Sequence, residues 1–143
     1  MKNLILIISL FIISFSTFSQ LITLNVTKVN KSVYKRDTIR YTIENNTNTT
    51  YIIDADKGTM SINFTDGRKN IKNKKVDVTK KSGIYYVKYK DTDMMNAGSD
   101  IDIVITINTN SKNVQFKNEH YVFKEKDITK VVIDFLKFNL KVV

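Results

Sequence analysis

Alternation of apolar and polar residues is the feature that most limits what this 143-residue chain can fold into. The longest example is Asp100 to Thr109, in which every second residue from Ile101 to Ile107 is isoleucine. Successive side chains of a strand point to opposite faces of a sheet, so this pattern is typical of a strand with one buried face. Polar turn residues such as Asp66-Gly67 separate further apolar runs. Those runs predict strands at 22–26, 38–44, 51–53, 60–64, 84–89, 114–116 and 121–123.

Residues 127–136 fit two kinds of secondary structure. A helix would begin at an Asp127 N-cap and bury a stripe that includes Val132 and Phe135, whereas a strand would bury Val131 and Ile133 together with Phe135. The β-branched run at 131–133 favours the strand. We predict two strands here, separated by a bulge or turn at the point where the inward-facing residues change from odd to even positions. The change is placed near Leu136-Lys137, and the second strand turns Phe138, Leu140 and Val142 inward.

The total of about eight or nine short strands predicts one all-β domain. Polar turns between consecutive strands favour antiparallel pairing, and we expect a β-sandwich of two packed antiparallel sheets. A small closed barrel is the alternative. The chain contains no cysteine and no proline, so its core must be stable without disulfides, and lysine is the main residue available to guard exposed sheet edges.

The N-terminus has the order of charge and hydropathy of a secretory signal peptide. Lys2 precedes the apolar run 4–13, and a cluster of small polar residues follows it. Small side chains at Thr17 and Ser19 predict cleavage after Ser19, which leaves residues 20–143 as the β-sandwich domain. Ser14 and Ser16 offer a second cleavage site.

An uncleaved membrane anchor from Leu4 to about Leu24 is the alternative for this segment. Serine and glutamine interrupt the apolar run, and strand-like alternation begins directly after it, so we favour cleavage. The protein is therefore predicted to be exported, to the periplasm or the cell exterior, and to meet a membrane only through an uncleaved signal segment.

The net charge of +9 points to anionic partners. Export makes intracellular nucleic acid a poor candidate, and it leaves an unknown protein or an anionic glycan as the expected partner. Lipopolysaccharide and extracellular DNA are further anions that an exported protein meets.

Residues that carry enzyme chemistry are scarce. His120 is the only histidine and there is no cysteine, so a zinc site or a histidine-activated nucleophile has almost nothing to draw on. Asp91, Asp93, Asp100 and Asp102 match no EF-hand calcium-loop spacing, and Asp100 and Asp102 are expected on the solvent face opposite Ile101 and Ile103. We predict no enzymatic activity, no metal and no cofactor.

Residues 68–81, the basic segment, contain most of the excess positive charge. Only Asp77 opposes the basic residues there, and the weak apolar pattern predicts a loop or a short, charged edge strand. A polyanion would bind such a segment by charge, with help from aromatic stacking if Tyr85 and Tyr89 on the next strand face it. The candidate anion-binding residues are Arg68, Lys69, Lys72, Lys74, Lys75, Lys80, Lys81, Tyr85 and Tyr89.

The stretch at residues 32–54, SVYKRDTIRYTIENNTNTTYIID, resembles a strand, asparagine-rich turn and strand of the immunoglobulin-like sandwiches of small exported bacterial proteins. Some domains of this kind, including the proteinase-inhibitor-like sandwiches, bind another protein through loops or an edge. The chain departs from antibody-type domains because it has neither core cysteines nor tryptophan. The resemblance implies an immunoglobulin-like fold and assigns no functional residue.

The leading functional hypothesis is a non-enzymatic, exported binding module that engages a partner through loops or an edge strand. The first alternative is a basic envelope factor that binds polysaccharide, lipopolysaccharide or extracellular DNA through the basic segment. The second alternative is a proteinase-inhibitor-like domain.

Overall fold

A computed structural model describes residues 20–92, 100–123 and 128–143. The predicted signal peptide lies outside these residues. The described chain forms nine strands, and none of its segments is a helix long and apolar enough to cross a membrane. The strands are β1 (Leu21–Lys35), β2 (Thr38–Asp54), β3 (Thr59–Phe64), β4 (Ile71–Lys75), β5 (Asp77–Lys81), β6 (Ile84–Thr92), β7 (Asp100–Asn108), β8 (Asn113–Phe123) and β9 (Ile128–Val142).

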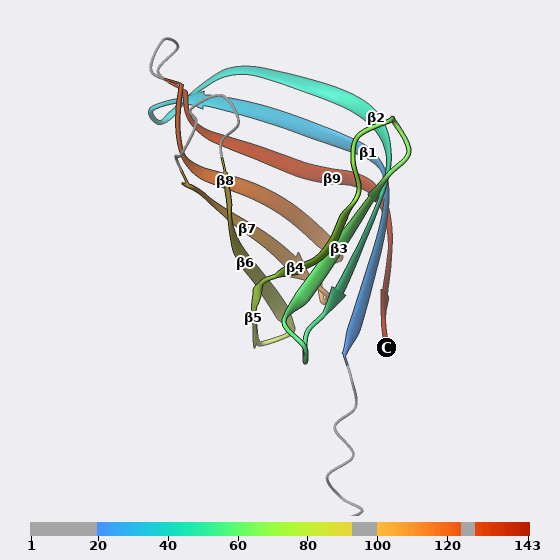
Figure 1. Cartoon of the computed structure of the whole chain (residues 1–143). Coiled ribbons are helices and arrows are strands. Elements are labelled where there is room, and N and C mark those ends of the chain that lie inside the picture. The colour runs from blue at the N-terminus through green and yellow to red at the C-terminus, as the bar shows by residue number, and fades with distance from the viewer. Residues whose placement is uncertain (1–19, 93–99, 124–127) are drawn as a thin grey trace, which may run out of the picture.

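All nine strands belong to one antiparallel sheet with the order β4-β3-β2-β1-β9-β8-β7-β6-β5 (Figure 1). Strands that pair are consecutive in the chain, except that β9 returns to pair with β1 from Ile22↔Val142 to Lys35↔Ile128. The prediction of an all-β antiparallel domain with about nine strands is confirmed. The expected pair of separate sheets is not seen, because the β1–β9 ladder joins both halves into a single sheet that is nearly barrel-shaped.

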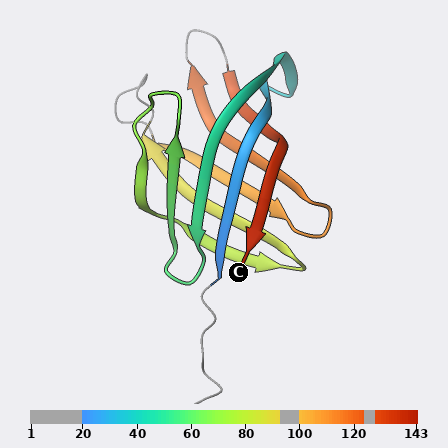
Figure 2. The same ribbon diagram turned by 90° about the vertical axis from the view of Figure 1, so that its right-hand side faces the viewer.

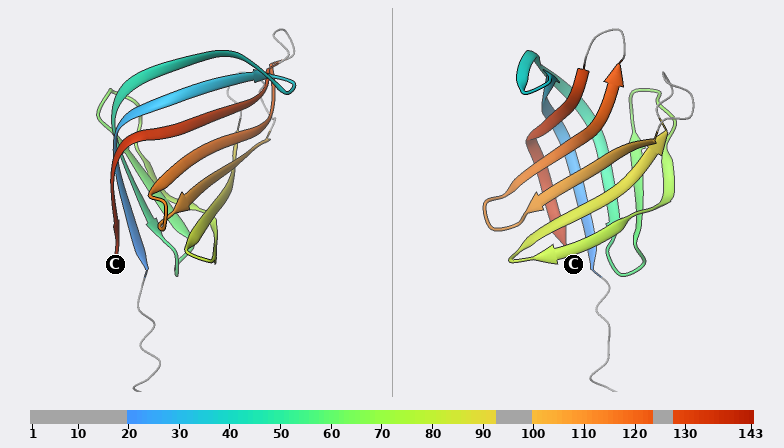
Figure 3. Two further views of the ribbon diagram at one scale, coloured as in Figure 1. Left: turned by 180° about the vertical axis from the view of Figure 1, so that it is seen from behind. Right: turned by 90° about the vertical axis from the view of Figure 1, so that its left-hand side faces the viewer.

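The sheet curls because its three long central strands bend. β1, β2 and β9 contain 15, 17 and 15 residues, and both ladders of β1 shift register between Val26 and Lys28. A bulge of this kind increases local twist and changes which residues face inward. On β1 the inward positions accordingly change from the buried Leu24 and Val26 to the half-buried Val29 and the buried Val33. Figures 2 and 3 show β1, β2 and β9 side by side, with β6, β7 and β8 crossing opposite them.

The C-terminal segment is a strand, as predicted, and its bulge lies at Leu136, within the region where the sequence pattern predicted a bulge or turn. Lys137 pairs with Lys28 and Phe135 pairs with Val29, so Leu136 is left without a partner on β1. The two predicted strands are nevertheless one continuous strand, β9, because β1 bulges at the same level and stays paired on both sides of the bend.

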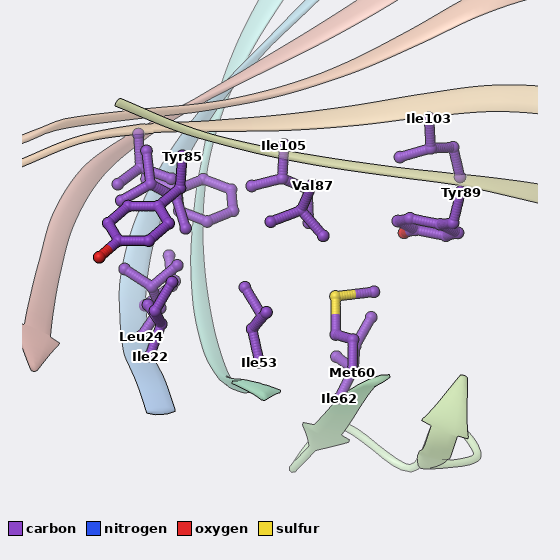
Figure 4. Packing of buried hydrophobic residues seen from close by; sticks show 14 of the residues in the cluster. Ile22, Leu24, Ile53, Met60, Ile62, Tyr85, Val87, Tyr89, Ile103 and Ile105 are labelled. Atoms are coloured by element: carbon purple, nitrogen blue, oxygen red, sulfur yellow. The ribbon is translucent and has the colours of Figure 1, made fainter. Parts of the chain in front are cut away.

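Inward side chains from both halves of the rolled sheet meet in one apolar core (Figure 4). The predicted row Ile101, Ile103, Ile105 and Ile107 on β7 is buried, and Ile105 and Ile107 have no solvent exposure. Across the core from this row lie Ile22, Leu24, Ile53, Met60 and Ile62. The predicted inward residues Phe138 and Leu140 are half-buried against the same cluster, and Val142 lies at the exposed end of β9.

The two edge strands meet at a corner instead of pairing. β4 and β5 are joined by Val76, whose backbone N–H donates a hydrogen bond of 2.9 Å to the carbonyl oxygen of Gly58. Gly58 has a φ of +61°, and a Cβ atom added to it would lie 3.0 Å from the Val76 carbonyl oxygen. A glycine is therefore required at this corner both by its backbone conformation and by the close approach of another backbone group.

We expect Gly58→Ala to lower the free energy of unfolding by about 1–2 kcal/mol, because alanine adds left-handed backbone strain and crowds the Val76 carbonyl. Gly67→Ala is the matched control, since Gly67 also has a positive φ, of +85°, but has no atom within 4 Å of an added Cβ. Urea unfolding of both variants measures the difference. Equal losses would mean that the contact with Val76 contributes nothing.

Candidate functional site

The basic segment forms the two edge strands of the sheet. Residues predicted as a loop or charged edge strand become β4 and β5. Ile71 of β4, Val78 of β5 and the connecting Val76 are partly buried against the core. Most of the lysines of these two strands are exposed, as are residues 68 and 69 of the preceding turn. The exposed members of the predicted site are Arg68, Lys69, Lys72, Lys75, Lys80 and Lys81, and Lys74 is half-buried.

Arg68 is engaged by a neighbouring carboxylate. Its Nε donates hydrogen bonds of 2.9 and 2.8 Å to the two carboxylate oxygens of Asp66, and its Nη2 lies 2.7 Å from Oδ2. The guanidinium carbon also lies 4.1 Å from the centre of the Phe64 ring. The hydrogen bonds lower the pKa of Asp66 and raise the pKa of Arg68. Because much of its donor set is used within this turn, Arg68 is better placed to close the turn than to hold an anion.

Tyr85 and Tyr89 point into the core rather than toward the lysines of the edge. Their exposed fractions are 2% and 9%, so neither ring offers a face for stacking at the surface. The Tyr85 hydroxyl donates a hydrogen bond of 3.0 Å to Oε1 of Gln20, and burial raises the pKa of Tyr89. Of the predicted site, the structure brings together Lys80 and Tyr85, with the Lys80 ammonium 4.9 Å from the ring centre. The remaining candidates are therefore the basic side chains alone.

A second exposed edge, which the sequence did not reveal, runs along residues 38–46 of β2. We call it the β2 edge. These residues pair with β1 on one side, whereas β3 pairs with β2 only from Thr49 to Asp54. Within the described chain, no strand covers the other side, and β2 forms the rim of the sheet in Figure 1.

Three large apolar side chains are exposed on the β2 edge. Ile39, Tyr41 and Ile43 are 51%, 42% and 46% exposed. A register shift between Val33 and Tyr34 separates Ile39 from the other two, which pair with Val33 and Lys31 of the inward row. The edge also presents Arg40 and Glu44, and Glu44 forms a salt bridge with Lys28. The arrangement offers a partner the side of β2 that no described strand pairs, together with an apolar pair and both signs of charge.

The other side chains considered for chemistry fall largely outside the description. Asp93 lies beyond the described residues, and His120 belongs to β8 with its side chain not among those described. In residues 20–92, 100–123 and 128–143, no group of three His, Cys, Asp or Glu side chains is arranged to hold a metal ion.

Comparisons with protein-family models, with curated proteins and with solved structures find no match for this chain.

Proposed function

We propose that this chain is a non-enzymatic binding module that accepts an extended segment of a partner protein as an added strand on the β2 edge. The observation that carries the proposal is the length and composition of this edge, in which residues 38–46 expose Ile39, Tyr41 and Ile43 on a side of β2 that no described strand pairs. An exposed strand edge of this kind is a template for pairing with another chain.

The two ends of the sheet provide the contrast that supports this proposal. β4 and β5 contain five residues each and are rich in lysine, which are two ways in which proteins keep sheet edges from pairing. The β2 edge is longer, and Arg40 is its only basic residue. The β2 edge is neither short nor rich in lysine, as expected for an edge that a partner protein covers.

The side chains of the edge define the partner strand that fits it. An added antiparallel strand should place apolar side chains beside Tyr41 and Ile43, and opposite charges beside Arg40 and Glu44. A second copy of the chain meets both requirements when Thr42 lies opposite Thr42 of that copy, because Arg40 then faces Glu44 and Tyr41 faces Ile43. Self-association is therefore measured together with binding to other proteins.

The test is a pull-down from the source cell envelope and culture medium, at low salt and at about 0.5 M salt, where charge interactions between exposed groups are screened. The paired variant Tyr41→Lys/Ile43→Lys should reduce capture at least tenfold, because it removes the apolar pair and adds like charge to the edge. Capture should survive high salt and should be unchanged in the control Lys72→Gln/Lys74→Gln/Lys75→Gln. Light scattering of the purified chain and both variants determines whether the captured strand is a second copy.

Binding that disappears at high salt and in the lysine control, but survives in the β2-edge variant, would contradict this proposal. It would support the second candidate function, in which the exposed lysines of β4 and β5 bind an anionic glycan, lipopolysaccharide or extracellular DNA. A proteinase-inhibitor-like role and an immunoglobulin-like classification stay predictions from residues 32–54. The proposed setting, outside the cytoplasm, follows from the predicted signal peptide.

A further inference from the structure

β8 and β9 separate at the bend of β9, and a groove opens where they part. Their ladder ends at Gln115↔Asp134, and residues 135–142 of β9 continue along β1 alone. The cause is the bulge at Leu136, which turns β9 with β1 and away from β8. Among the described residues no strand pairs with the other side of this part of β9. Figure 2 shows the end of β9 beside β1, clear of the β7–β8 turn.

The groove has a volume of about 790 Å³. One wall is residues 136–140 and 142 of β9, and the other walls come from β5, β6 and the β7–β8 turn. The volume lies within the range of about 300–1,000 Å³ that is usual for small-molecule sites. The lining residues are Lys80, Tyr85, Thr109, Lys112, Leu136, Lys137, Phe138, Asn139, Leu140 and Val142.

The lining of the groove is amphipathic. Apolar surface comes from Leu136, Phe138, Leu140 and Val142 of β9, of which Leu136 and Val142 are 46% and 40% exposed, and the buried Tyr85 ring lies behind it. Apolar side chains that are this exposed on the wall of a concave site gain stability when an apolar ligand covers them. The apolar part of the groove therefore suits a hydrocarbon chain.

Three lysines give the same groove its charge. Lys80, Lys112 and Lys137 all line it and are exposed, and none of the described lining residues is acidic. No described carboxylate forms a salt bridge with any of the three. The Lys80 ammonium lies over the Tyr85 ring, which places one positive charge directly beside an aromatic side chain of the core. The complementary ligand carries a negative head group and an apolar chain.

We infer that this groove, independently of the β2 edge, binds a long-chain carboxylate, with the hydrocarbon chain against Leu136, Phe138 and Leu140 and the carboxylate held by Lys80, Lys112 and Lys137. Both halves of the ligand are needed. Exposed lysines alone bind small anions weakly, and an open apolar wall alone does not select for charge.

The experiment titrates the full chain with dodecanoate, with dodecanol and with acetate, by calorimetry or by displacement of a fluorescent fatty-acid probe. Dodecanoate should bind at least tenfold more tightly than dodecanol, and acetate should not bind measurably. Lys80→Gln/Lys112→Gln/Lys137→Gln should weaken dodecanoate binding about tenfold or more and leave dodecanol binding unchanged. Leu140→Asn should weaken both.

The control is Lys72→Gln/Lys74→Gln/Lys75→Gln, which removes the same total charge from the β4 edge and should leave dodecanoate binding unchanged. Equal losses in the two triple variants would show that only net charge matters, and equal affinity for acid and alcohol would show that the lysines do not hold the carboxylate. Lysine-dependent binding to vesicles of anionic phospholipid, without binding of free dodecanoate, would make the ligand a lipid surface. Each of these three results overturns the inference.

Discussion

Replacing Ile105 with alanine is expected to lower the free energy of unfolding by about 4 kcal/mol, because the side chain is fully buried and its removal leaves a cavity. Ile105 lies at the middle of β7 and pairs with Val87 of β6 on one side and Phe116 of β8 on the other. Closely packed ladders on both sides limit how far the neighbouring strands can relax into the space. The cost should therefore lie near the upper end for such substitutions.

Urea or guanidinium unfolding of Ile105→Ala, Ile105→Val and Thr106→Ala measures this cost. The valine variant removes one methyl group and should lose about 1 kcal/mol, and Thr106→Ala on the opposite face should lose still less. A loss below about 1.5 kcal/mol for Ile105→Ala would contradict a closely packed core at this position.

The inner row of β7 is also the clearest case of structure that could be predicted from sequence. Ile101 to Ile107 alternate without interruption, and the structure buries all four isoleucines of the row. The bulge near Leu136 could also be predicted. The inward-facing residues change there from odd to even positions, and one regular strand cannot contain both patterns. Local patterns of this kind determine which side chains face inward.

Those local patterns could not predict which strands pair in the sheet. β1 and β9 lie at the two ends of the described domain, so no local turn in the sequence predicts that they pair. Sandwich and barrel contain similar strands and differ mainly in whether such long-range ladders form. The sequence therefore indicated most of the strand positions, but it divided β2, β8 and β9 into two strands each and favoured a sandwich over the single rolled sheet that forms.

The candidate sites depended on the same long-range contacts. Ile39, Tyr41 and Ile43 show the alternation of a buried strand, yet they are exposed because β3 ends before it reaches them. The reverse holds for Tyr85 and Tyr89, which could equally have faced solvent but lie in the core opposite β1, β2 and β3. Charge was easier to predict, since most basic side chains of residues 68–81 are exposed.

Alkaline pH is expected to destabilise the protein through its buried tyrosines. Burial raises the pKa of Tyr51 from its usual value of 10.0 to about 12, and the positive charge of Arg68 offsets only part of that rise. The Tyr51 ring lies 5.5 Å from the ring of Phe135, within the partly buried layer around the core. Burial, with smaller contributions from the charges of Tyr51 and Asp91, also raises the pKa of Tyr89.

The raised pKa determines the direction of the pH dependence. The folded state keeps the neutral phenol of Tyr51 while the unfolded chain already ionises it, so the stabilisation is complete below pH 10 and is lost as the pH rises to about 12. At 1.36 kcal/mol per pKa unit, the rise from 10.0 to about 12 corresponds to about 2.7 kcal/mol in full, of which about 2 kcal/mol should be lost by pH 12. Tyr89, whose pKa is also raised, adds to the loss.

Denaturant unfolding at pH 9 and at pH 12 tests this, with tyrosinate absorbance recorded on the same samples. Tyr51→Phe should remove about 2 kcal/mol of the difference in unfolding free energy between the two pH values, because phenylalanine keeps the ring and cannot ionise. Tyr89→Phe should remove a further part, and the two effects should not be strictly additive because the charge of Tyr51 raises the pKa of Tyr89. An unchanged pH dependence in Tyr51→Phe would mean that the Tyr51 phenol is solvated in the folded protein and that the layer around Phe135 is open to water.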